Sequence, residues 1–423
     1  MLFFEATCAG GSSKLASRGK VTIIGAGLSG LSAALYLDRA GFEVTVFEKN
    51  DRIGGVVATD FVDGFFLDVG FQVILDSYPE LRRIFGIDGL DLRYFDRGVT
   101  YVENDGRQNS VLAPIGIGDV KGLLPLLGEF SLFEKLALAH ISYDAYSSRI
   151  EPKPNFASTS FRDYLRKNRR LSERVVDSYI APFMRGVTLA PNLDVTADFA
   201  LFVLGNFITG KAAVPDTGMA DLPAAIASKM RRDAIVLSKC AIEVSDNSVR
   251  FEDGDEVEHD YLVLAVKANE VQQILGSDIT AEYRGVRSFY FATEREILNG
   301  ATLKVAIDPK HPVTTSVVIS QVSKSYAPKG VNLISVSSLD FEKSHVEVAE
   351  ATASMYGLEG KDLSIVRSYF VDTALPTRYG QNSPFGLKQQ YSKRIRIVGD
   401  YMASPSIDGA IKAGREAAFK LIG

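Results

Sequence analysis

The chain has 423 residues, enough for two domains with substantial cores. Its net charge of −5 at pH 7 and its sequence pI of about 5.6 argue against a nucleic-acid surface, and no basic tract is present. Cys8 and Cys240 lack the spacing of a metal or redox motif, which predicts a reducing, cytoplasmic location without disulfides. The four histidines are scattered singly, so we expect no metal site.

Residues 1–19 are expected to form a flexible tail. Their apolar run at 2–4 is too short for a signal peptide. A membrane-spanning helix is not expected either, because such a helix needs a run of about 18 apolar residues and the chain has none.

The most specific pattern lies close to the N-terminus. Residues 21–24 form a short apolar run of the kind that is buried in a parallel sheet. Gly25, Gly27 and Gly30 then supply G-x-G-x-x-G, and residues 28–40 continue with helical periodicity. In such a turn the first glycine permits a tight bend, the second lets backbone approach a pyrophosphate, and the third allows helix to pack closely on strand. The free N–H groups at the start of this helix would face the phosphates.

A second strand and an acidic residue complete this pattern. Residues 43–47 alternate as a strand that ends at Glu48, at the distance from the glycines where a ribose-binding acid is found. A carboxylate there can accept hydrogen bonds from ribose hydroxyls, and it disfavours a 2′-phosphate. A chance glycine match on an ordinary strand–helix turn is the competing explanation. Because strand, helix, second strand and acid all fall into place, we predict a bound dinucleotide.

The turn that follows the acid narrows this prediction. Arg52-Ile53-Gly54-Gly55 resembles the flavin amine oxidase superfamily, which includes monoamine oxidases, protoporphyrinogen oxidase and the phytoene desaturases. In that family the turn carries the chain past the FAD pyrophosphate, and two adjacent glycines let its amides reach phosphate oxygens. Residues 64–72 resemble the family's next stretch, which runs beside the ribityl chain and the flavin.

The far end of the chain carries the same resemblance. Residues 396–400 form an expected strand that ends in Gly399-Asp400, and a helix is expected to open near Ile407. The resemblance implies that Asp400 meets the ribitol hydroxyls and that backbone from Ile407 to Ala410 lies at the pyrimidine edge of the flavin. A helix N-terminus there would stabilise negative charge on the reduced ring.

Three short strands are expected in the middle of the chain, at 235–244, 248–251 and 261–266. The resemblance implies that this segment completes the FAD domain and that backbone near Ala241 meets the adenine. Covalent attachment through a thioether would need a cysteine shortly before the closing block. None is present there, so we predict that FAD is held non-covalently.

The resemblance predicts an α/β protein with a Rossmann-type FAD-binding domain and a discontinuous α+β substrate domain. The FAD-binding domain is expected at 20–74, 234–278 and 388–423, and the substrate domain at 75–233 and 279–387. The implied cofactor contacts are Gly25, Gly27, Leu28, Ser29, Gly30, Glu48, Lys49, Arg52, Gly54, Gly55, Gly70, Phe71, Gln72, Ala241, Gly399, Asp400, Ile407 and Ala410.

The two segments of the expected substrate domain differ in pattern. The first is largely helical, with helical periodicity at 132–141, 161–167 and 172–180. The second is rich in strands, at 286–292, 302–307, 315–319 and 331–337. We expect that sheet to floor the substrate cavity. The apolar stretch 111–127 lines a channel, rests on a membrane surface or folds as a loop over the core, and all three readings stay open.

We expect an FAD-dependent oxidoreductase that transfers hydride to flavin N5 from a C–N or C–C bond of a largely apolar small molecule or an amine. Oxygen or another electron acceptor would reoxidise it. Residues 181–187 and 326–330 resemble desaturase-type members, whereas residues 404–410 resemble amine-oxidase relatives. The alternatives are an isoprenoid or carotenoid desaturase or isomerase, a flavin-binding protein without turnover, and a nicotinamide dehydrogenase.

The sequence alone does not identify a catalytic residue. Amine oxidases commonly hold a lysine on a strand of the substrate-domain sheet, and the matching stretch 286–291 has none, which leaves Lys304 as the candidate. A solvated strand lysine is the competing explanation for Lys304. The aromatic residues that could approach a flavin are Tyr369, Phe370, Tyr379 and Tyr401.

Overall fold

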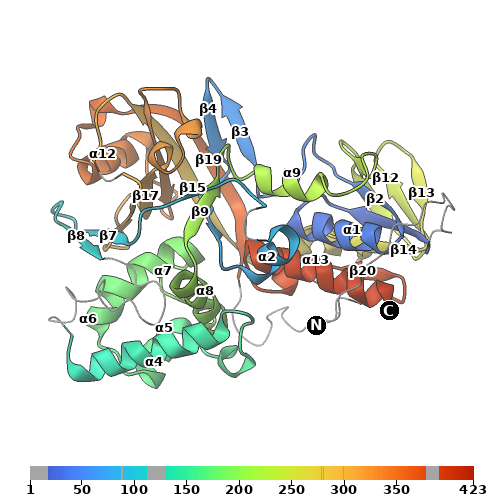
Figure 1. Ribbon diagram of the computed structural model, residues 1–423, viewed down its shortest axis with the longest axis horizontal. Coiled ribbons are helices and arrows are strands. Elements are labelled where there is room, and N and C mark those ends of the chain that lie inside the picture. Colours follow the sequence, from blue (N-terminus) through green and yellow to red (C-terminus); the bar gives the residue numbers. More distant parts are fainter. Residues whose placement is uncertain are drawn as a thin grey trace.

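The computed structural model describes residues 18–86, 89–111, 130–277, 279, 281–298, 300–377 and 390–423. Two large sheets organise these residues, a five-stranded parallel sheet and a seven-stranded mixed sheet. Figure 1 shows the two sheets on opposite sides of the molecule, with a cluster of helices below the seven-stranded one. The expected tail and the apolar stretch 111–127 lie outside the described residues except at their ends, and so does Tyr379.

The five-stranded sheet has the strand order that is typical of nucleotide-binding α/β folds. Its strands in spatial order are β10 (Ile235–Val236), β2 (Glu43–Phe47), β1 (Lys20–Ile24), β14 (Tyr261–Leu264) and β20 (Ile395–Ile397). All neighbouring strands are parallel, and their apolar side chains are buried because other elements cover both faces. The chain order reverses between β1 and β14, and open α/β sheets bind ligands at such a switch point.

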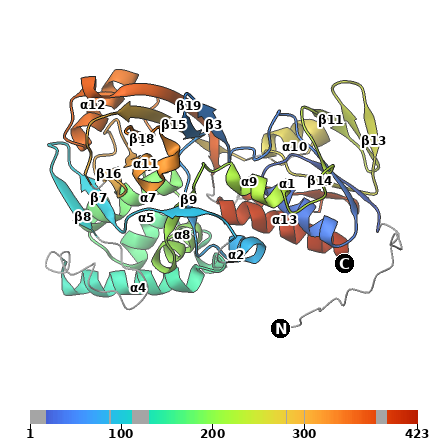
Figure 2. The same cartoon turned by 45° about the horizontal axis from the view of Figure 1, so that its top comes forward.

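Helices α1 (Leu28–Arg39) and α13 (Ile407–Ile422) cover one face of this sheet and lie side by side, as Figures 1 and 2 show. Their close approach requires Gly414, because a Cβ there would lie 2.1 Å from the Ser29 carbonyl oxygen. The Ser32 hydroxyl also donates a hydrogen bond of 2.8 Å to the Ile411 carbonyl. Helix α9 (Asp221–Ala227) flanks α1.

The other face of the five-stranded sheet packs on a small antiparallel sheet and one helix. The sheet comprises β11 (Ala241–Val244), β12 (Ser248–Phe251) and β13 (Glu256–Glu258), and the helix is α10 (Ala268–Leu275). Val249, Phe251 and Val271 form one apolar cluster with the buried side chains of β1, β14 and β20. This cluster fixes the middle of the chain against the N-terminal unit.

The seven-stranded sheet combines strands from two distant parts of the chain. Its strands in spatial order are β19 (Ser364–Pro376), β15 (Tyr283–Thr293), β18 (Asn332–Ser338), β17 (Thr315–Val318), β16 (Leu303–Ala306), β7 (Val99–Val102) and β8 (Gln108–Val111). The junction is the parallel pair of β16 with β7. Helix α12 (His345–Met355) packs on one face over Phe289, Phe291 and Val336.

Three of the helices below this sheet begin with a serine N-cap. Ser131 and Glu134 form a capping box at the start of α4, and the Ser160 and Ser172 hydroxyls cap α5 and α6. The helices are α4 (Leu132–Ser148), α5 (Phe161–Asp163), α6 (Glu173–Val175), α7 (Ala181–Thr188) and α8 (Ala197–Thr209). Single π-helical turns, Tyr164–Asn168 and Val176–Ile180, extend α5 and α6.

The remaining short elements lie around the two large sheets. They are the hairpin β3 (Thr59–Val62) and β4 (Phe65–Asp68), the helices α2 (Pro79–Phe85) and α11 (Ile319–Val322), and the three-stranded sheet β5 (Ile74–Leu75), β9 (Ala212–Pro215) and β6 (Leu92–Tyr94). Four short 3-10 turns are also present in the described residues, at Pro154–Phe156, Lys324–Tyr326, Gly360–Asp362 and Asp400–Met402.

The expected helices and the four expected strands of the second segment are present, with two corrections elsewhere. Residues 235–244 do not form one strand, because the chain leaves the five-stranded sheet at Ser238, whose φ is +56°. The N–H groups of Ser238 and Lys239 bond to the Asn50 and Glu48 carbonyls instead. The first segment is also less helical than expected, since it contributes β5 to β9. The thirteen-residue strand β19 and helix α12 were not foreseen.

Candidate functional site

One cavity of about 950 Å³ runs between the two large sheets. The carboxyl ends of four parallel strands open into it, through Gly25 after β1, Glu48 after β2, Val266 after β14 and Gly399 after β20. The cavity therefore begins at the switch point of the five-stranded sheet, where nucleotide ligands bind in folds of this kind.

The three fingerprint glycines have three different geometries. Gly25 has φ of +100°, and a Cβ there would lie 2.5 Å from the Ala265 carbonyl oxygen. A Cβ on Gly30 would lie 2.0 Å from the Gly25 carbonyl oxygen, so only glycine allows α1 to start where it does. A Cβ on Gly27 would meet no protein atom within 4 Å, and Gly27 lines the cavity. The N-terminus of α1 is thus open to a ligand phosphate.

Glu48 is held in a fixed orientation at the end of β2. Its Oε2 atom accepts a hydrogen bond of 2.8 Å from the Ala26 N–H, and its Oε1 atom accepts bonds from the backbone and side chain of Asn50. The buried carboxylate also lines the cavity. A carboxylate oxygen can accept two hydrogen bonds, so Oε2 retains capacity for a ribose hydroxyl.

The Arg-x-Gly-Gly turn packs directly against the first glycine loop. The Gly54 N–H donates to the Ala26 carbonyl at 2.9 Å, and Gly54 has φ of +107°. A Cβ on Gly55 would lie 3.4 Å from the Cα of Gly27. The two glycine loops together form one end of the cavity. The Arg52 side chain points elsewhere, to an ion pair of 2.5 Å with Asp60.

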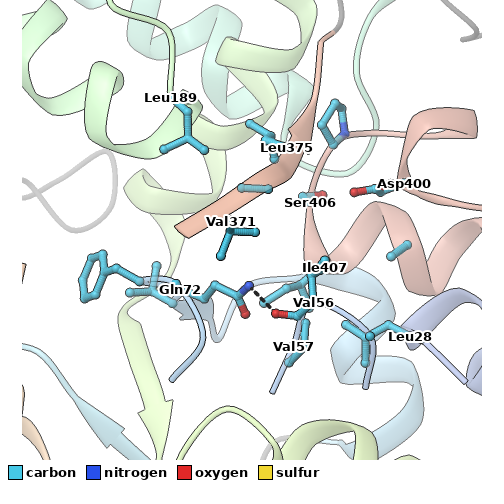
Figure 3. Close-up of a pocket in the computed structure, with 18 of the residues that line it drawn as sticks. Leu28, Val56, Val57, Gln72, Leu189, Val371, Leu375, Asp400, Ser406 and Ile407 are labelled. Atoms are coloured by element: carbon cyan, nitrogen blue, oxygen red, sulfur yellow. Dashed lines mark hydrogen bonds between the residues drawn. The ribbon is translucent and has the colours of Figure 1, made fainter. Parts of the chain in front are cut away.

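Asp400 and the start of α13 form the wall of the cavity that faces the two glycine loops. Burial raises the pKa of the Asp400 carboxyl to about 6, and this carboxyl lines the cavity. The Ser406 hydroxyl caps α13 by accepting a bond of 3.0 Å from the Gly409 N–H. Figure 3 shows Asp400, Ser406 and Ile407 around the same space as Leu28 at the start of α1. Two helix N-termini therefore converge on this part of the cavity.

Nearly all the predicted cofactor residues come together around this cavity. Gly30 and Arg52 are the two that do not line it, the first because it packs within the fold and the second because it pairs with Asp60. The residues that do are Gly25, Gly27, Leu28, Ser29, Glu48, Lys49, Gly54, Gly55, Gly70, Phe71, Gln72, Ala241, Gly399, Asp400, Ile407 and Ala410.

The far half of the cavity is an apolar chamber. One wall is the face of the seven-stranded sheet opposite to α12, and alternation along the strands brings the side chains of that face into the chamber. Helices α7 and α8 form the other wall. The lining residues of this half include Val99, Tyr101, Phe183, Val187, Leu189, Phe199, Val203, Phe207, Val286, Leu303, Thr315, Ser337, Val371 and Leu375.

Lys304 lies on the wrong face of the sheet to reach this chamber. Its neighbour Leu303 lines the chamber, so the Lys304 side chain points to the side covered by α12. There its ammonium donates to the Gln108 side chain at 2.9 Å and to the Met355 carbonyl at 2.5 Å, near the C-terminus of α12. Burial lowers the pKa of Lys304 to about 8. We therefore do not assign Lys304 a part in catalysis.

The aromatic candidates are spread over different places. Tyr401 lines the cavity and donates a hydrogen bond of 3.0 Å to the Val266 carbonyl. The Tyr369 hydroxyl donates to Asp60, outside the lining, and Phe370 is 61% exposed.

Sequence reasoning missed three charged residues that line the other half of the cavity. We call this half, which contains the two glycine loops, Glu48 and Asp400, the nucleotide half. Lys239 precedes β11, Lys267 follows the end of β14, and Glu270 lies in α10. Lys267 donates to the Thr373 hydroxyl on β19 and so bridges the two large sheets. The signal that could have found Lys267 is its position just after a parallel strand, the edge at which α/β sheets bind ligands.

This donor set fits an adenine dinucleotide with a flavin half. Gly27, Gly54 and the free start of α1 suit a pyrophosphate, and Glu48 suits a ribose. Desolvation raises the pKa of the Asp400 carboxyl, and hydroxyl donors in the cavity would relieve that cost. Fold and cavity together define a dinucleotide-binding α/β protein whose cofactor end opens into an apolar chamber.

The chain belongs to a family of flavoproteins. The sequence model described as "Flavin containing amine oxidoreductase" matches residues 28–422, so the protein is a member of that family. The family's description specifies a flavin cofactor and oxidoreductase chemistry. The predictions of a flavin oxidoreductase of this superfamily and of a Rossmann-type α/β fold are confirmed.

Curated relatives match only in part. A 4,4′-diapophytoene desaturase of Staphylococcus aureus is 31% identical over 135 residues, which are 28% of this chain and 26% of the desaturase. A carotenoid 3,4-desaturase of Haloarcula japonica is 38% identical over 96 residues, or 22% of this chain and 19% of that enzyme. The chain thus matches about a quarter or less of the length of these relatives.

Solved structures agree with the fold over nearly the whole chain. An oxidoreductase from Methanosarcina mazei aligns with a TM-score of 0.74 at 13% identity, covering 94% of this chain and 99% of its own. Putrescine oxidase bound to putrescine aligns with a TM-score of 0.68 at 20% identity, covering 96% and 99%. At these identities the likeness establishes the architecture alone. In the described part of the chain, no helix is both long and apolar enough to cross a bilayer.

Proposed function

We propose that the protein binds FAD non-covalently along the nucleotide half of the cavity. The order of the groups supports this, since Ala241 and Glu48 suit the adenosine, the two glycine loops suit the pyrophosphate, and Asp400 suits the ribityl chain. Cys240, the one cysteine among the described residues, sits beside Ala241 at the adenosine end. A thioether to the flavin ring would need a cysteine at the opposite end.

We infer that the protein is an FAD-dependent oxidoreductase that removes hydride from a C–N or C–C bond of a largely apolar small molecule. The observation that carries this proposal is the continuity of the cavity from the fingerprint glycines into the apolar chamber. When bound, the flavin supplies a two-electron acceptor. The segments 75–233 and 279–387 would then form the substrate domain, since both contribute strands to the chamber wall.

The protein's own side chains would bind, orient and desolvate the substrate. Phe183, Leu189 and Phe207 project apolar surface from the helical wall, and Val286 and Leu303 do so from the sheet. Such a chamber excludes water and orients an apolar substrate through shape rather than through hydrogen bonds. Because α7 packs on the seven-stranded sheet at Gly186 and Thr315, and α8 packs on α4 at Gly205 and Ala145, this wall is pre-formed.

The chamber favours a C–C bond over a charged amine as the site of oxidation. Among the described lining residues, the charged side chains of the far half are Asp96, Arg97 and Lys211, which are exposed at the rim. None comes from α7, α8 or the seven-stranded sheet. A cationic substrate would lose hydration there without gaining a partner. The names of the partial relatives, two desaturases of carotenoid-type substrates, point the same way.

An anaerobic flavin-bleaching screen tests this proposal. The purified protein, loaded with FAD, would be mixed with amines, porphyrinogens and carotenoid precursors, and loss of the flavin absorption band would be followed. We expect bleaching by an apolar polyene precursor and none by small amines. Bleaching by amines alone would contradict the C–C assignment, and a protein that binds FAD but is bleached by nothing would be a flavin-binding protein without turnover. Peroxide release on reoxidation would separate oxygen from another acceptor.

We further propose that one face of α4 contacts a membrane surface, from which an apolar substrate could enter. Leu132, Phe133, Leu136 and Tyr143 are 71%, 85%, 59% and 66% exposed. No Asp, Glu, Lys or Arg is among the exposed residues of this helix, and the sequence before it, 111–127, is apolar. Exposed apolar patches of this kind mark interaction surfaces.

Sedimentation with phosphatidylcholine vesicles tests the membrane contact. The wild-type chain should co-sediment with the vesicles, and a Phe133→Ser/Leu136→Ser double variant should remain in the supernatant. A matched variant on another exposed apolar residue, Phe61→Ser on β3, should sediment like wild type. Equal sedimentation of the α4 variant and wild type would refute the contact.

A further inference from the structure

Two hydroxyl side chains interrupt the apolar wall that the seven-stranded sheet presents to the chamber. Thr315 on β17 and Ser337 on β18 both line the cavity, and they are only 3% and 4% exposed. They stand directly opposite each other in the antiparallel register, so their side chains lie on the same face of the sheet as close neighbours. Val286 on β15 and Leu303 on β16, which line the cavity from the strands on either side, are apolar.

The packing of α7 shows where the Thr315 side chain points. A Cβ on Gly186, which also lines the cavity, would lie 2.3 Å from Thr315 Cγ2 and 3.9 Å from Thr315 Oγ1. Thr315 therefore projects toward α7, on the chamber side of the sheet, and the missing side chain at Gly186 leaves space beside its hydroxyl. Ser337 projects to the same side because it is paired with Thr315.

Neither hydroxyl has a hydrogen-bond partner among the residues that the structure describes, yet both oxygens can be reached. In this sheet, the unpartnered hydroxyls that are fully enclosed are those of Ser288 and Ser335. The Thr315 and Ser337 oxygens are not enclosed in this way, and both residues line the chamber. A molecule in the chamber can therefore hydrogen-bond to them.

Hydroxyls on the opposite face of the same sheet do have partners. The Thr100 and Ser110 hydroxyls lie 2.9 Å apart, and the Ser316 hydroxyl lies 3.0 Å from that of Tyr356. Native structures pair buried polar groups with protein, water or ligand, because an unpaired one is costly. On the chamber side, the partner is therefore supplied by what fills the chamber.

The surroundings of the pair restrict the charge of that partner. Among the described lining residues of this half, the charged side chains lie at the rim, so a carboxylate or ammonium beside the pair would lose hydration without gaining a counter-charge. We propose that the substrate is a largely apolar molecule with one neutral oxygen, a hydroxyl or a carbonyl, to which Thr315 and Ser337 hydrogen-bond. This inference rests on the proposed function and adds one polar anchor to the shape of the chamber.

Equilibrium dialysis of the FAD-loaded protein against two matched isoprenoids tests the inference. Farnesol carries one hydroxyl and farnesene carries none, and dialysis gives their dissociation constants without turnover. In Thr315→Val/Ser337→Ala we expect the ratio of the farnesol constant to the farnesene constant to rise about tenfold, as for the loss of hydrogen bonds of modest net strength. Thr100→Val/Ser110→Ala removes the same two groups outside the lining, and the ratio should keep its wild-type value.

The melting temperature of each variant shows that the fold is kept. Thr315→Val/Ser337→Ala should melt at the wild-type temperature or above, since neither hydroxyl bonds to a described residue. Ser337→Ala alone, which removes only an oxygen, should raise the ratio about threefold.

Three results would overturn the inference. They are an unchanged ratio in the Thr315 and Ser337 variants, no binding of farnesol to wild type, and tighter binding of ionised farnesoic acid than of farnesol. Failure of the wild-type chain to bind FAD would instead overturn the proposed function. Dialysis of the cofactor-stripped protein would still test the hydroxyl pair in that case.

Discussion

Two glycines three residues apart should respond in opposite ways to the same substitution. Gly27 has φ of −69° and ψ of 175°, which any residue can adopt, and its added Cβ would meet no protein atom within 4 Å. Gly30 would place a Cβ 2.0 Å from the Gly25 carbonyl oxygen and 3.1 Å from the Ala265 side chain. Alanine at the first position fills cavity space, whereas alanine at the second forces backbone apart.

The two geometries set the expected magnitudes. Gly27→Ala should change the unfolding free energy of the cofactor-stripped protein by no more than about 0.5 kcal/mol, as for a substitution without a clash. Gly30→Ala should cost about 1–3 kcal/mol or more, the range for overpacking, because the Gly25 carbonyl is backbone and cannot turn aside. That cost is a large fraction of a typical stability of about 5–15 kcal/mol.

The assay pairs urea unfolding of the stripped protein with FAD titration. For Gly27→Ala we expect a wild-type unfolding curve and FAD affinity reduced at least tenfold, about 1.4 kcal/mol, because the methyl group would occupy the space that we propose for the pyrophosphate. For Gly30→Ala we expect loss of stability before any effect on binding can be read. Wild-type FAD affinity in Gly27→Ala, or a wild-type unfolding curve in Gly30→Ala, would refute the reasoning.

Three other predictions concern the chamber wall and the buried titratable groups. Gly186→Ala would put a Cβ 2.3 Å from the Thr315 Cγ2 atom and should cost about 1–3 kcal/mol in urea unfolding, most of which Thr315→Ser should restore in the double variant by deleting that methyl. Lys304→Met should leave FAD affinity and the rate of anaerobic flavin reduction within about twofold of wild type, and a hundredfold loss would return Lys304 to the site. Burial lowers the pKa of His259 below its ordinary 6.5, so the folded state binds fewer protons than the unfolded one and stability falls as the pH drops through about 6.5. His259→Leu should flatten that dependence in unfolding curves recorded at several pH values, whereas His140→Leu on the exposed face of α4 should not.

The nucleotide end of the protein was predictable because its signals are local. The turn from β1 to α1 and the Arg-x-Gly-Gly turn are each specified by residues a few positions apart. The resemblance implies that both turns lie at the pyrophosphate, and this predicts that they lie close together. Glu48 was predictable from its distance to the glycines alone. The strands 286–292 and 331–337 were also visible, since a buried strand carries its apolar pattern within its own residues.

The errors concern partners rather than patterns. Residues 235–244 carry a continuous strand pattern, yet hydrogen bonds from Ser238 and Lys239 to the 48–50 turn divide them between two sheets. The pairing of β7 with β16 joins residues about 200 positions apart, and no local signal records it. Lys304 illustrates the consequence, because a strand lysine points to one of two faces and only the position of α12 decides which face is covered.

The sequence by itself determined the cofactor class, because a dinucleotide site is built from backbone loops whose glycines and single acid lie close together in the chain. The tertiary structure decided the rest of the site. It brought α7, α8 and one face of a sheet from two distant segments together as the apolar chamber, and it turned the Lys304 ammonium away from that chamber. These outcomes depend on long-range packing and on which face of a strand is buried, and neither is written in a local stretch of residues.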